Sequence, residues 1–471
     1  MKNLAASILF LIIFSASGIL TAQMTIEVNS VPQLTPLLDQ IYIAGSFNNW
    51  TPADAAFMLT QTDGNWNVVI NGTENETVEF KFMRDGGWSM VEGNSSGAFI
   101  PNRSIVFHNG TTQTLSIEGW EDLAGTHTVT NRVRILDTDF AMPQLNRARR
   151  IWVSLPLNYE SSGAHYPVIY MHDGQNLFDT ATSFSGEWNV DETMIGNAAP
   201  PCLNVIVVGV DNGSENRIDE YSPWLNAEYN DGGEGDQYAD FITQTLKPFI
   251  DNYFRTIPDR EHTATAGSSL GALIAMYLIS RNNDVFSRAG IFSPAFWFNP
   301  EIYDYVTSHV MNSNTRIYFV CGDAESTGMI PGMEQMENIV AAQQIPASNI
   351  QYIITPGGQH NEYYWSQQFP PVIISLFPCL VSVRDIRMVP IIKIYPNPAH
   401  EFINIELVNG ELQRIEILDS QGRIIRDETM NNKRKINVGD LLPGSHHLRY
   451  YYKITGSDTC IQSDTITFII R

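Results

Sequence analysis

Three blocks of the chain differ in how hydrophobic and polar residues alternate. Residues 24–119 contain short alternating runs, such as Ile41 to Ala44 and Val78 to Phe82, separated by Asn, Gly, Asp and Pro. A period of two is typical of strands with one buried face, and closely spaced turns indicate a small β-sandwich. Residues 391–471 return to this pattern, for example at Phe402 to Leu407, and so predict a second β-sandwich.

The middle block, residues 132–378, alternates short apolar runs with helix-forming runs such as 235–254. Continuous apolar strands are typical of a parallel sheet that is covered on both faces. This block therefore predicts an α/β fold with a doubly wound sheet, flanked by the two β-sandwiches. The expected strands are Tyr166–Met171, Val205–Val210, His262–Ala266, Ala289–Phe292, Ile317–Val320 and Ile350–Thr355.

Chain length indicates several domains, and net charge limits the classes of binding partner. With 471 residues, 43% of them hydrophobic, the chain can bury a core in each of several domains. The formal net charge is −23, from 51 acidic and 28 basic residues. Phosphates would be repelled by this charge, which argues against nucleic acid or an anionic membrane as a partner.

The first residues have the pattern of a secretory signal peptide. Lys2 precedes an apolar run from Ala5 to Leu20, which ends in small residues. We expect residues 1–22 to be removed after Ala22, with an uncleaved anchor as the alternative. No later run is long and apolar enough to cross a bilayer, so no transmembrane anchor is expected in the mature chain. The four cysteines lack zinc-type spacing, and no metal is expected.

Ser269 is the candidate nucleophile. It lies at the centre of Gly267-Ser268-Ser269-Leu270-Gly271, between an apolar run and the helix-forming run Ala272 to Ile279. A serine in a sharp turn between strand and helix has its Oγ raised from the sheet, and the flanking glycines allow close packing. The alternative is a solvated serine in an ordinary glycine turn.

A serine nucleophile needs a base and a carboxylate that orients the base. Between Ser269 and the last block lie two histidines, His309 and His360. His360 follows the expected strand 350–355 through a short loop, where this type of sheet collects its chemistry, whereas His309 ends a predicted amphipathic helix. We therefore expect His360 to be the base, the alternative being a solvated loop histidine.

The acid is expected in the loop after the preceding strand, where Asp323 and Glu325 compete. The spacing after Gly322 favours Glu325, and Asp323 is the alternative. An oxyanion also needs backbone N–H donors, which we expect from Leu270 and from Gly174 or Gln175 after the strand 168–171.

Several segments in the middle block carry a resemblance to a known family. They are Tyr170–Phe178, Arg217, Glu220–Trp224 and Ala266–Ala272. In this order they resemble the α/β-hydrolase family that contains enterochelin-type, feruloyl and acetyl-xylan esterases. The resemblance covers residues 132–378. It implies a serine esterase without metal or organic cofactor, with Ser269, His360 and Glu325 as its triad. Substrate is expected near Trp188, Arg217, Trp224 and Trp297, with a buried structural role as the alternative for the aromatic residues.

The first block resembles a glycogen-binding module. The resemblance rests on Gly45–Trp50, Glu79–Phe82 and Asp85–Trp88. It implies that Trp50 and Trp88 stack on sugar rings, and that Lys81 and Asn102 bond sugar hydroxyls. A sandwich that only packs against the enzyme is the alternative.

The last block resembles the C-terminal sorting domain of the type IX secretion system. The resemblance rests on Ile394–Ala399 at the start of a terminal sandwich. It implies export across an outer membrane by that machinery, followed by removal of the domain, so the enzyme would be secreted or held at the cell surface. A spacer sandwich is the alternative.

Together these observations predict a secreted esterase that acts on acylated carbohydrates. We expect a polysaccharide among its binding partners. A siderophore esterase and an acyltransferase would use the same triad. A surface glycan-binding protein with an inactive esterase domain is the alternative from another class.

Overall fold

A computed structural model describes residues 22–378, except 86 and 196–203, and residues 391–470, except 409, 420–422, 431–433 and 455–459. It divides into two compact units, Met1–Cys379 and Leu380–Arg471. The expected signal peptide lies outside the described residues apart from Ala22, with which the first strand begins. Within the described residues, no helix is both long and apolar enough to cross a membrane.

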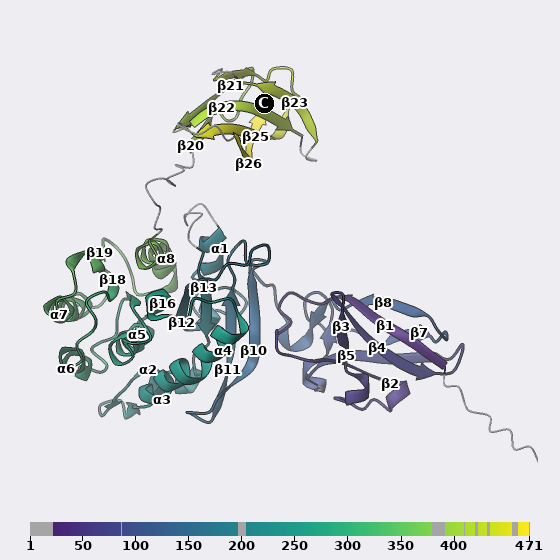
Figure 1. The fold of residues 1–471 in the computed structure, drawn as a ribbon, viewed down its shortest axis with the longest axis horizontal. Helices are drawn as coiled ribbons and strands as arrows, with labels where there is room; N and C mark the ends of the chain where they lie inside the picture. The colour runs from purple at the N-terminus through teal and green to yellow at the C-terminus, as the bar shows by residue number, and fades with distance from the viewer. Residues whose placement is uncertain are drawn as a thin grey trace, which may run out of the picture. The chain divides into compact units, whose positions relative to one another are not determined.

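The first unit begins with a β-sandwich (Figure 1). One sheet has the order β3-β4-β1-β8, and the facing sheet has the order β2-β5-β7. Buried and exposed positions alternate along β1, so every second side chain enters the core between the sheets. The strands are β1 (Ala22–Ser30), β2 (Ile41–Gly45), β3 (Thr60–Thr62), β4 (Asn65–Gly72), β5 (Thr77–Arg84), β7 (Arg103–Val106) and β8 (Thr112–Ser116), with a small pair β6 (Glu92–Gly93) and β9 (Gly119–Trp120).

An eight-stranded sheet follows, with the order β10-β11-β13-β12-β16-β17-β18-β19. Strand β11 pairs antiparallel with both β10 and β13, and all pairs from β13 through β12, β16, β17 and β18 to β19 are parallel. All five residues of β12 are buried, as expected for a strand covered on both faces. The strands are β10 (Val133–Met142), β11 (Arg147–Ser154), β12 (Val168–His172), β13 (Ile206–Val210), β16 (Thr263–Ser268), β17 (Arg288–Phe292), β18 (Arg316–Gly322) and β19 (Ile350–Thr355). A short hairpin, β14 (Leu225–Asn226) and β15 (Asp231–Gly232), lies outside this sheet.

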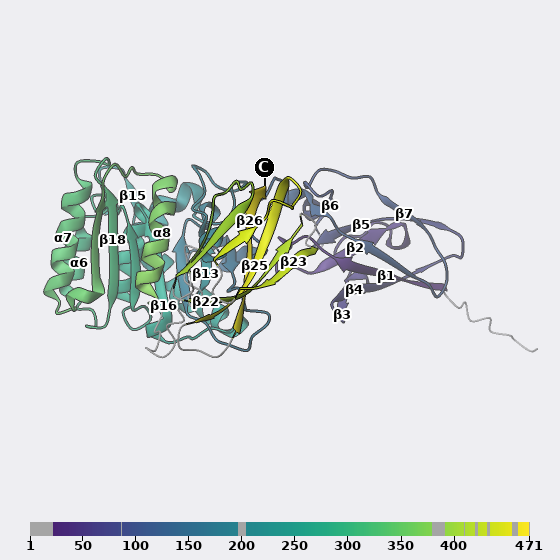
Figure 2. The ribbon, with the colours of Figure 1, turned by 90° about the horizontal axis from the view of Figure 1, so that it is seen from above.

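Helices cover both faces of this sheet (Figure 2). Side chains of α5, α6 and α7 enter the core on one face, and those of α1 and α8 enter the core on the other. This mixed α/β architecture confirms the predicted fold class. The helices are α1 (Val190–Ile195), α2 (Arg217–Tyr221), α3 (Gly235–Asp240), α4 (Lys247–Tyr253), α5 (Leu270–Arg281), α6 (Glu301–Ser308), α7 (Met329–Ala342) and α8 (Glu362–Leu376). Residues 235–254, expected as one helix, form α3 and α4 joined by the π-helix Phe241–Leu246.

The sandwich is tied to the sheet by backbone hydrogen bonds, and ion pairs of Arg84 hold the segment that makes them. The N–H groups of Leu37 and Leu38 donate to the carbonyls of Ile135 and Leu136 on β10, at 2.9 and 3.1 Å. The fully buried guanidinium of Arg84, at the end of β5, pairs with Asp39 and Asp122. These contacts fix one side of the sandwich against β10.

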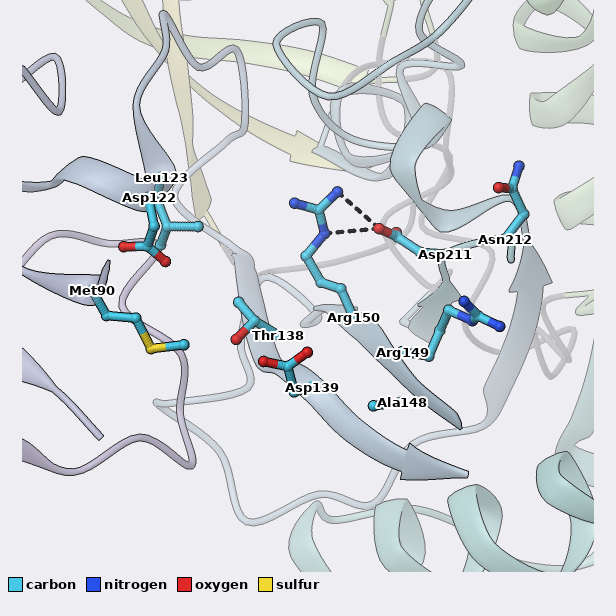
Figure 3. A pocket seen from close by; sticks show the side chains of 10 residues that line it. All are labelled: Met90, Asp122, Leu123, Thr138, Asp139, Ala148, Arg149, Arg150, Asp211 and Asn212. Carbon is cyan, nitrogen blue, oxygen red and sulfur yellow. Dashed lines mark hydrogen bonds and ion pairs between the residues drawn. The ribbon is translucent and has the colours of Figure 1, made fainter. Parts of the chain in front are cut away.

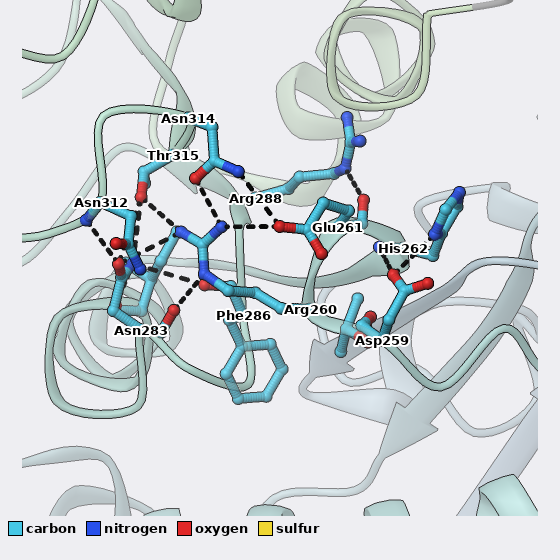
Figure 4. Close-up of polar contacts among 12 residues, drawn as sticks. Asp259, Arg260, Glu261, His262, Asn283, Phe286, Arg288, Asn312, Asn314 and Thr315 are labelled. Carbon is cyan, nitrogen blue, oxygen red and sulfur yellow. Dashed lines mark hydrogen bonds and ion pairs between the residues drawn. The ribbon is translucent and has the colours of Figure 1, made fainter.

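The amino edge of the sheet is closed by Arg260, which precedes β16 (Figure 4). Its Nη1 donates to Asn314 Oδ1 at 2.6 Å, and its Nη2 donates to Thr315 Oγ1 at 2.8 Å. Arg260 Nε donates to the carbonyl of Asn283. One side chain therefore joins the loops that enter β16, β17 and β18.

The second unit is a β-sandwich with its own core. Its sheets have the orders β20-β21-β24 and β23-β22-β25-β26. Every described residue of this core lies between 394 and 470. The strands are β20 (Ile391–Tyr395), β21 (Phe402–Val408), β22 (Gly410–Leu418), β23 (Ile424–Thr429), β24 (Lys435–Asn437), β25 (Gly444–Ile454) and β26 (Cys460–Ile470).

Candidate active site

Ser269 occupies a strained turn between β16 and α5. Its φ and ψ are 57° and −120°, a conformation that side-chain-bearing residues rarely adopt. A Cβ on Gly267 would lie 2.6 Å from the carbonyl oxygen of Gly271, so the turn needs glycine there. The turn is anchored to the segment after β17, because Ser269 N donates to Phe292 O and Ala295 N donates to Ser269 O, each at 3.0 Å.

His360 and Glu325 meet at the same edge of the sheet. His360 Nδ1 lies 2.8 Å from Glu325 Oε2. The Glu325 side chain is fully buried, while that of His360 is 39% exposed. Glu325 Oε1 also accepts from Gly322 N at 2.7 Å, which is the turn that the sequence spacing indicated. A carboxylate on Nδ1 holds the tautomer whose Nε2 can accept a proton.

Asp323 has a different contact. Its Oδ1 accepts from the backbone N–H of Gly357, at 2.6 Å, in the loop that carries His360. Of the two competing carboxylates, Glu325 is therefore the one placed against the histidine, and Asp323 shapes the loop.

Ser293 is a site residue that sequence analysis missed. It follows β17 with a φ of 44° and is fully buried. Its Oγ donates to Glu325 Oε1 at 2.7 Å and accepts from Trp365 Nε1 at 2.9 Å. The Trp365 ring stands edge-on to His360, 5.0 Å between centroids. Ser293 thus links the carboxylate to the aromatic wall beside the imidazole; no motif marks it in the sequence.

Ser269 Oγ and His360 share no hydrogen bond in this part of the described chain. The strands place both residues at the carboxyl edge, since Ser269 follows β16 and His360 follows β19. Such catalytic hydrogen bonds are often long without substrate and shorten when it binds.

The expected oxyanion donors begin two short helical elements. Leu270 is the first residue of α5, so its N–H has no acceptor within the helix. Gly174 and Gln175 lie in the 3-10 turn Gly174–Asn176 after β12. A Cβ on Gly174 would lie 2.8 Å from the backbone of Val210, so only glycine fits against β13. These amides lie after two adjacent parallel strands, β12 and β16.

An ion pair beneath this turn fixes its position. Arg217 Nε and Nη2 donate to the two oxygens of Asp173, at 2.7 and 2.9 Å, and Asn212 Nδ2 adds a bond of 2.7 Å. Burial alone would raise the pKa of Asp173, but the Arg217 guanidinium and these hydrogen bonds lower it below its usual value. Arg217, expected near substrate, is therefore engaged with the turn that carries Gly174.

His172 lies under the site and is nearly fully buried. Its Nδ1 lies 2.9 Å from the hydroxyl of Tyr238, and its Nε2 lies 3.2 Å from Thr265 Oγ1. Burial lowers the pKa of His172 to about 4, so the imidazole is neutral at pH 7. Its role in this structure is packing.

The three expected substrate-binding tryptophans have different surroundings. Trp188 is 3% exposed and packs between Phe292 and Trp365, with ring centroids at 5.0 and 5.7 Å. Trp224 is half-buried against aromatic rings of α5 and α6. Trp297 is 58% exposed and lies beside the exposed ring of Tyr229, at 6.2 Å. Only Trp297 offers a broad open face.

The expected glycan residues of the sandwich are brought together in part. The rings of Trp50 and Trp88 lie 6.2 Å apart, and Trp88 is 44% exposed. Lys81 is only 4% exposed, because its Nζ donates to the carbonyl of Ile100 at 2.6 Å. Asn102 is exposed and donates to Glu79 Oε2 at 3.4 Å. The aromatic pair is available to a ligand, whereas the lysine ammonium is engaged.

One group of acidic residues in the described chain has the spacing to hold a cation. The ligand atoms of Glu187, Asp191 and Glu192 lie within 4.8 Å of one another. Burial, followed by the charge of Asp191, raises the pKa of Glu192 to about 8. A proton held by Glu192 relieves the repulsion in this group without a metal.

Two family models and two known proteins match parts of this chain. The family model described as "Putative esterase" matches residues 142–376, and that of the "Secretion system C-terminal sorting domain" matches residues 393–467. An uncharacterised protein of Bacillus subtilis, YbbA, is 24% identical over 233 residues, which cover 47% of this chain and 89% of YbbA. An alpha-amylase of Niallia circulans is 41% identical over 95 residues, covering 20% of this chain and 7% of the amylase.

Three solved structures are also similar to this chain, with sequence identities lower than those of the two proteins above. The BES protein of Bacillus cereus is 17% identical with a TM-score of 0.43, covering 54% of this chain and 98% of its own. The feruloyl esterase module of Clostridium thermocellum, complexed with sinapinate, is 16% identical with a TM-score of 0.40, covering 53% and 89%. The enterobactin esterase of Shigella flexneri is 14% identical with a TM-score of 0.40, covering 72% and 88%.

Proposed function

Because residues 142–376 of this chain belong to the esterase family and residues 393–467 are a secretion sorting domain, we propose that it is an exported serine hydrolase that cleaves carboxylic esters through an acyl-enzyme on Ser269. One observation carries the assignment of roles. The strained Ser269 turn lies at the same sheet edge as a histidine whose Nδ1 is held by a buried carboxylate. This is the arrangement that a serine nucleophile requires.

The first half of the reaction forms the acyl-enzyme. Ser269 Oγ attacks the ester carbonyl carbon while His360 Nε2 takes the hydroxyl proton. Glu325, on Nδ1, stabilises the imidazolium that forms. The carbonyl oxygen becomes an anion, which the N–H groups of Leu270 and of Gly174 or Gln175 bind. When the bond to the alcohol oxygen breaks, His360 returns the proton to that oxygen and the alcohol leaves.

The second half restores the enzyme. The oxygen of a water molecule attacks the acyl carbon while His360 takes a proton from that water. The second oxyanion that forms is bound by the same N–H donors. The bond to Ser269 Oγ then breaks, and His360 protonates the serine. The products are a carboxylic acid and an alcohol.

The experiment compares the purified protein with Ser269→Ala on short p-nitrophenyl esters, acetylated sugars and methyl ferulate. We expect kcat to fall at least about 10⁴-fold in the variant, because removal of a triad nucleophile costs about that much or more. Circular dichroism and thermal unfolding should be unchanged. Equal activity in both proteins would exclude Ser269 as the nucleophile.

We further propose that the ester belongs to an acylated carbohydrate. The support is the Trp50–Trp88 pair on the sandwich, since flat rings suit the C–H faces of sugars. Siderophore esters and acyl transfer to a sugar use the same triad. Turnover of a catecholate ester instead of acetylated sugars would favour the former, and competition between water and a sugar acceptor would identify the latter.

A glycan-binding protein with an inactive esterase domain is the proposal from another class, and the same aromatic pair favours it. It predicts that a polysaccharide affinity gel retains the protein, that Trp50→Ala with Trp88→Ala abolishes retention, and that no ester is turned over. Ser269-dependent turnover would exclude this alternative.

A further inference from the structure

A polar cleft of about 370 Å³ lies between the sandwich and the α/β sheet of the first unit (Figure 3). Figure 3 shows that one wall carries Met90, Asp122 and Leu123, and that the other carries side chains of β10 and β11. The remaining lining residues are Thr138, Asp139, Ala148, Arg149, Arg150, Asp211 and Asn212.

One end of the cleft is hydrogen-bonded to residues 173–176, the turn after β12 that carries the expected donors Gly174 and Gln175 and is called the oxyanion turn below. Asn212 N donates to Gln175 Oε1 at 3.1 Å, and Asn212 Nδ2 donates to Asp173 Oδ1 at 2.7 Å. Asp211, beside it, accepts from Arg150 Nε and Trp152 Nε1, both at 2.8 Å. A ligand in the cleft would therefore lie next to the residues that hold Gln175.

The opposite end of the cleft approaches the aromatic pair of the sandwich. Met90 is the last residue of the 3-10 turn Trp88–Met90, so the exposed ring of Trp88 belongs to the same turn as a lining side chain. The buried Arg84 guanidinium holds Asp122 on this wall. One end of the cleft is therefore lined from the turn that carries Trp88, and the other end by Asn212, which is bonded to Gln175.

The charges in the cleft disfavour an anionic ligand. Arg150 pairs with Asp211 and Arg149 pairs with Glu220, so both guanidinium groups of the lining are engaged within the protein, whereas the exposed carboxylate of Asp139 has no ion-pair partner among the described residues. What remains for a ligand is a set of fixed N–H donors and carboxylate, amide and hydroxyl acceptors. Sugar hydroxyls both donate and accept hydrogen bonds and suit such a lining, whereas an anion would find no unpaired cation among the described lining residues.

We propose that this cleft is a binding site for a neutral oligosaccharide, which runs from the Trp50–Trp88 pair to the oxyanion turn. The inference rests on the proposed function, because this oligosaccharide is the alcohol part of the ester that Ser269 cleaves. Sugar units on both sides of the acylated one would then contribute to binding, and longer chains would bind more tightly.

The test measures binding without catalysis. Isothermal titration calorimetry with unacylated xylo-, cello-, malto- and manno-oligosaccharides of increasing length is carried out on the full mature chain. Ala148→Trp fills the cleft from an exposed strand position, and Asp139→Ala removes an exposed acceptor with a smaller change in volume. Ala341→Trp, on an exposed face of α7, is the matched control.

We expect at least one oligosaccharide series to bind more tightly with length, Ala148→Trp to weaken it about tenfold, and Ala341→Trp to leave it unchanged. Asp139→Ala should weaken it less than Ala148→Trp. Absence of binding by the unchanged protein, or equal affinity in Ala148→Trp, would overturn the proposal. Hydrolysis of p-nitrophenyl acetate by every variant reports on the esterase separately, so failure of the cleft and failure of the proposed function are distinguishable.

Discussion

The two edges of the central sheet are built in opposite ways. At the carboxyl edge, the residue after each of β12, β16 and β17 has a positive φ: Asp173 at 57°, Ser269 at 57° and Ser293 at 44°. At the amino edge, none of residues 259–262, 285–287 and 312–315, all of them described, has one. Each such conformation costs about 1–3 kcal/mol and persists only where the surroundings enforce it.

At the amino edge, side-chain hydrogen bonds join loops whose backbone conformations are ordinary. Every nitrogen of the Arg260 guanidinium has an acceptor there, and the loops before three strands share this one side chain. At the carboxyl edge, hydrogen bonds are instead used to hold unfavourable backbone conformations and a buried carboxylate in place. Polar contacts thus stabilise the fold at one edge and, at the other, hold the candidate catalytic residues in place.

Conversion of each carboxylate in the loop after β18 into its amide should give the largest effect on kcat. Glu325→Gln is expected to lower kcat by about 10³–10⁴-fold, because an amide on Nδ1 favours the wrong tautomer of His360. Asp323→Asn, the control, should lower kcat less than about tenfold, since it contacts only the loop. Steady-state kinetics on p-nitrophenyl acetate measure both. A larger loss in Asp323→Asn would assign the acid to Asp323.

A pair of arginine substitutions tests the comparison between the edges directly. Arg217→Met should lower kcat about 10–100-fold, because the oxyanion turn loses the partner of Asp173 and shifts. Arg260→Met should lower the free energy of unfolding by about 2–4 kcal/mol through its orphaned partners, and leave kcat of the folded enzyme within about twofold. Urea unfolding and steady-state kinetics of both variants decide. Similar kinetic losses in both would refute the difference between the edges.

The smallest effect concerns pH. The folded-state pKa of His172, about 4, lies below its unfolded value, so the unfolded chain binds more protons between these two values. The contribution of His172 to stability is present above about pH 6.5 and is lost as the pH falls, by about 2 kcal/mol at pH 5. His172→Gln should remove this part of the slope in urea unfolding measured at pH 7 and pH 5. An unchanged slope would show that other groups cause it.

Much of the architecture followed from the sequence because the strands of the parallel sheet are short, apolar and bounded by turns. The strand expected at Ile350–Thr355 has these bounds in the structure. The helix expected over 235–254 is interrupted, and Pro248 explains why. Proline has no N–H and its ring crowds the carbonyl four residues earlier, so the hydrogen-bond pattern widens before it and α4 starts anew around it.

The side chains around the site were harder to predict, because their contacts come from distant segments. Lys81 reads as an exposed strand residue, yet the loop with Ile100 covers it. Ser293 has no local motif, and its importance depends on Glu325 and Trp365, which lie 32 and 72 residues away. By contrast, Ser269 directly follows β16, and Glu325 and His360 lie in the short loops after β18 and β19, so the pattern of strands indicated where to look for them.

The separate cores of the two units have a consequence for the life of the protein after export. Every described core residue of the second unit lies in 394–470, and none of the cores of the first unit contains a residue beyond 377. Proteolytic removal of the sorting domain would therefore withdraw no side chain from the esterase core. We therefore expect the esterase domain to keep its fold after the sorting domain is detached, so that folding of the enzyme does not depend on the segment that addresses it.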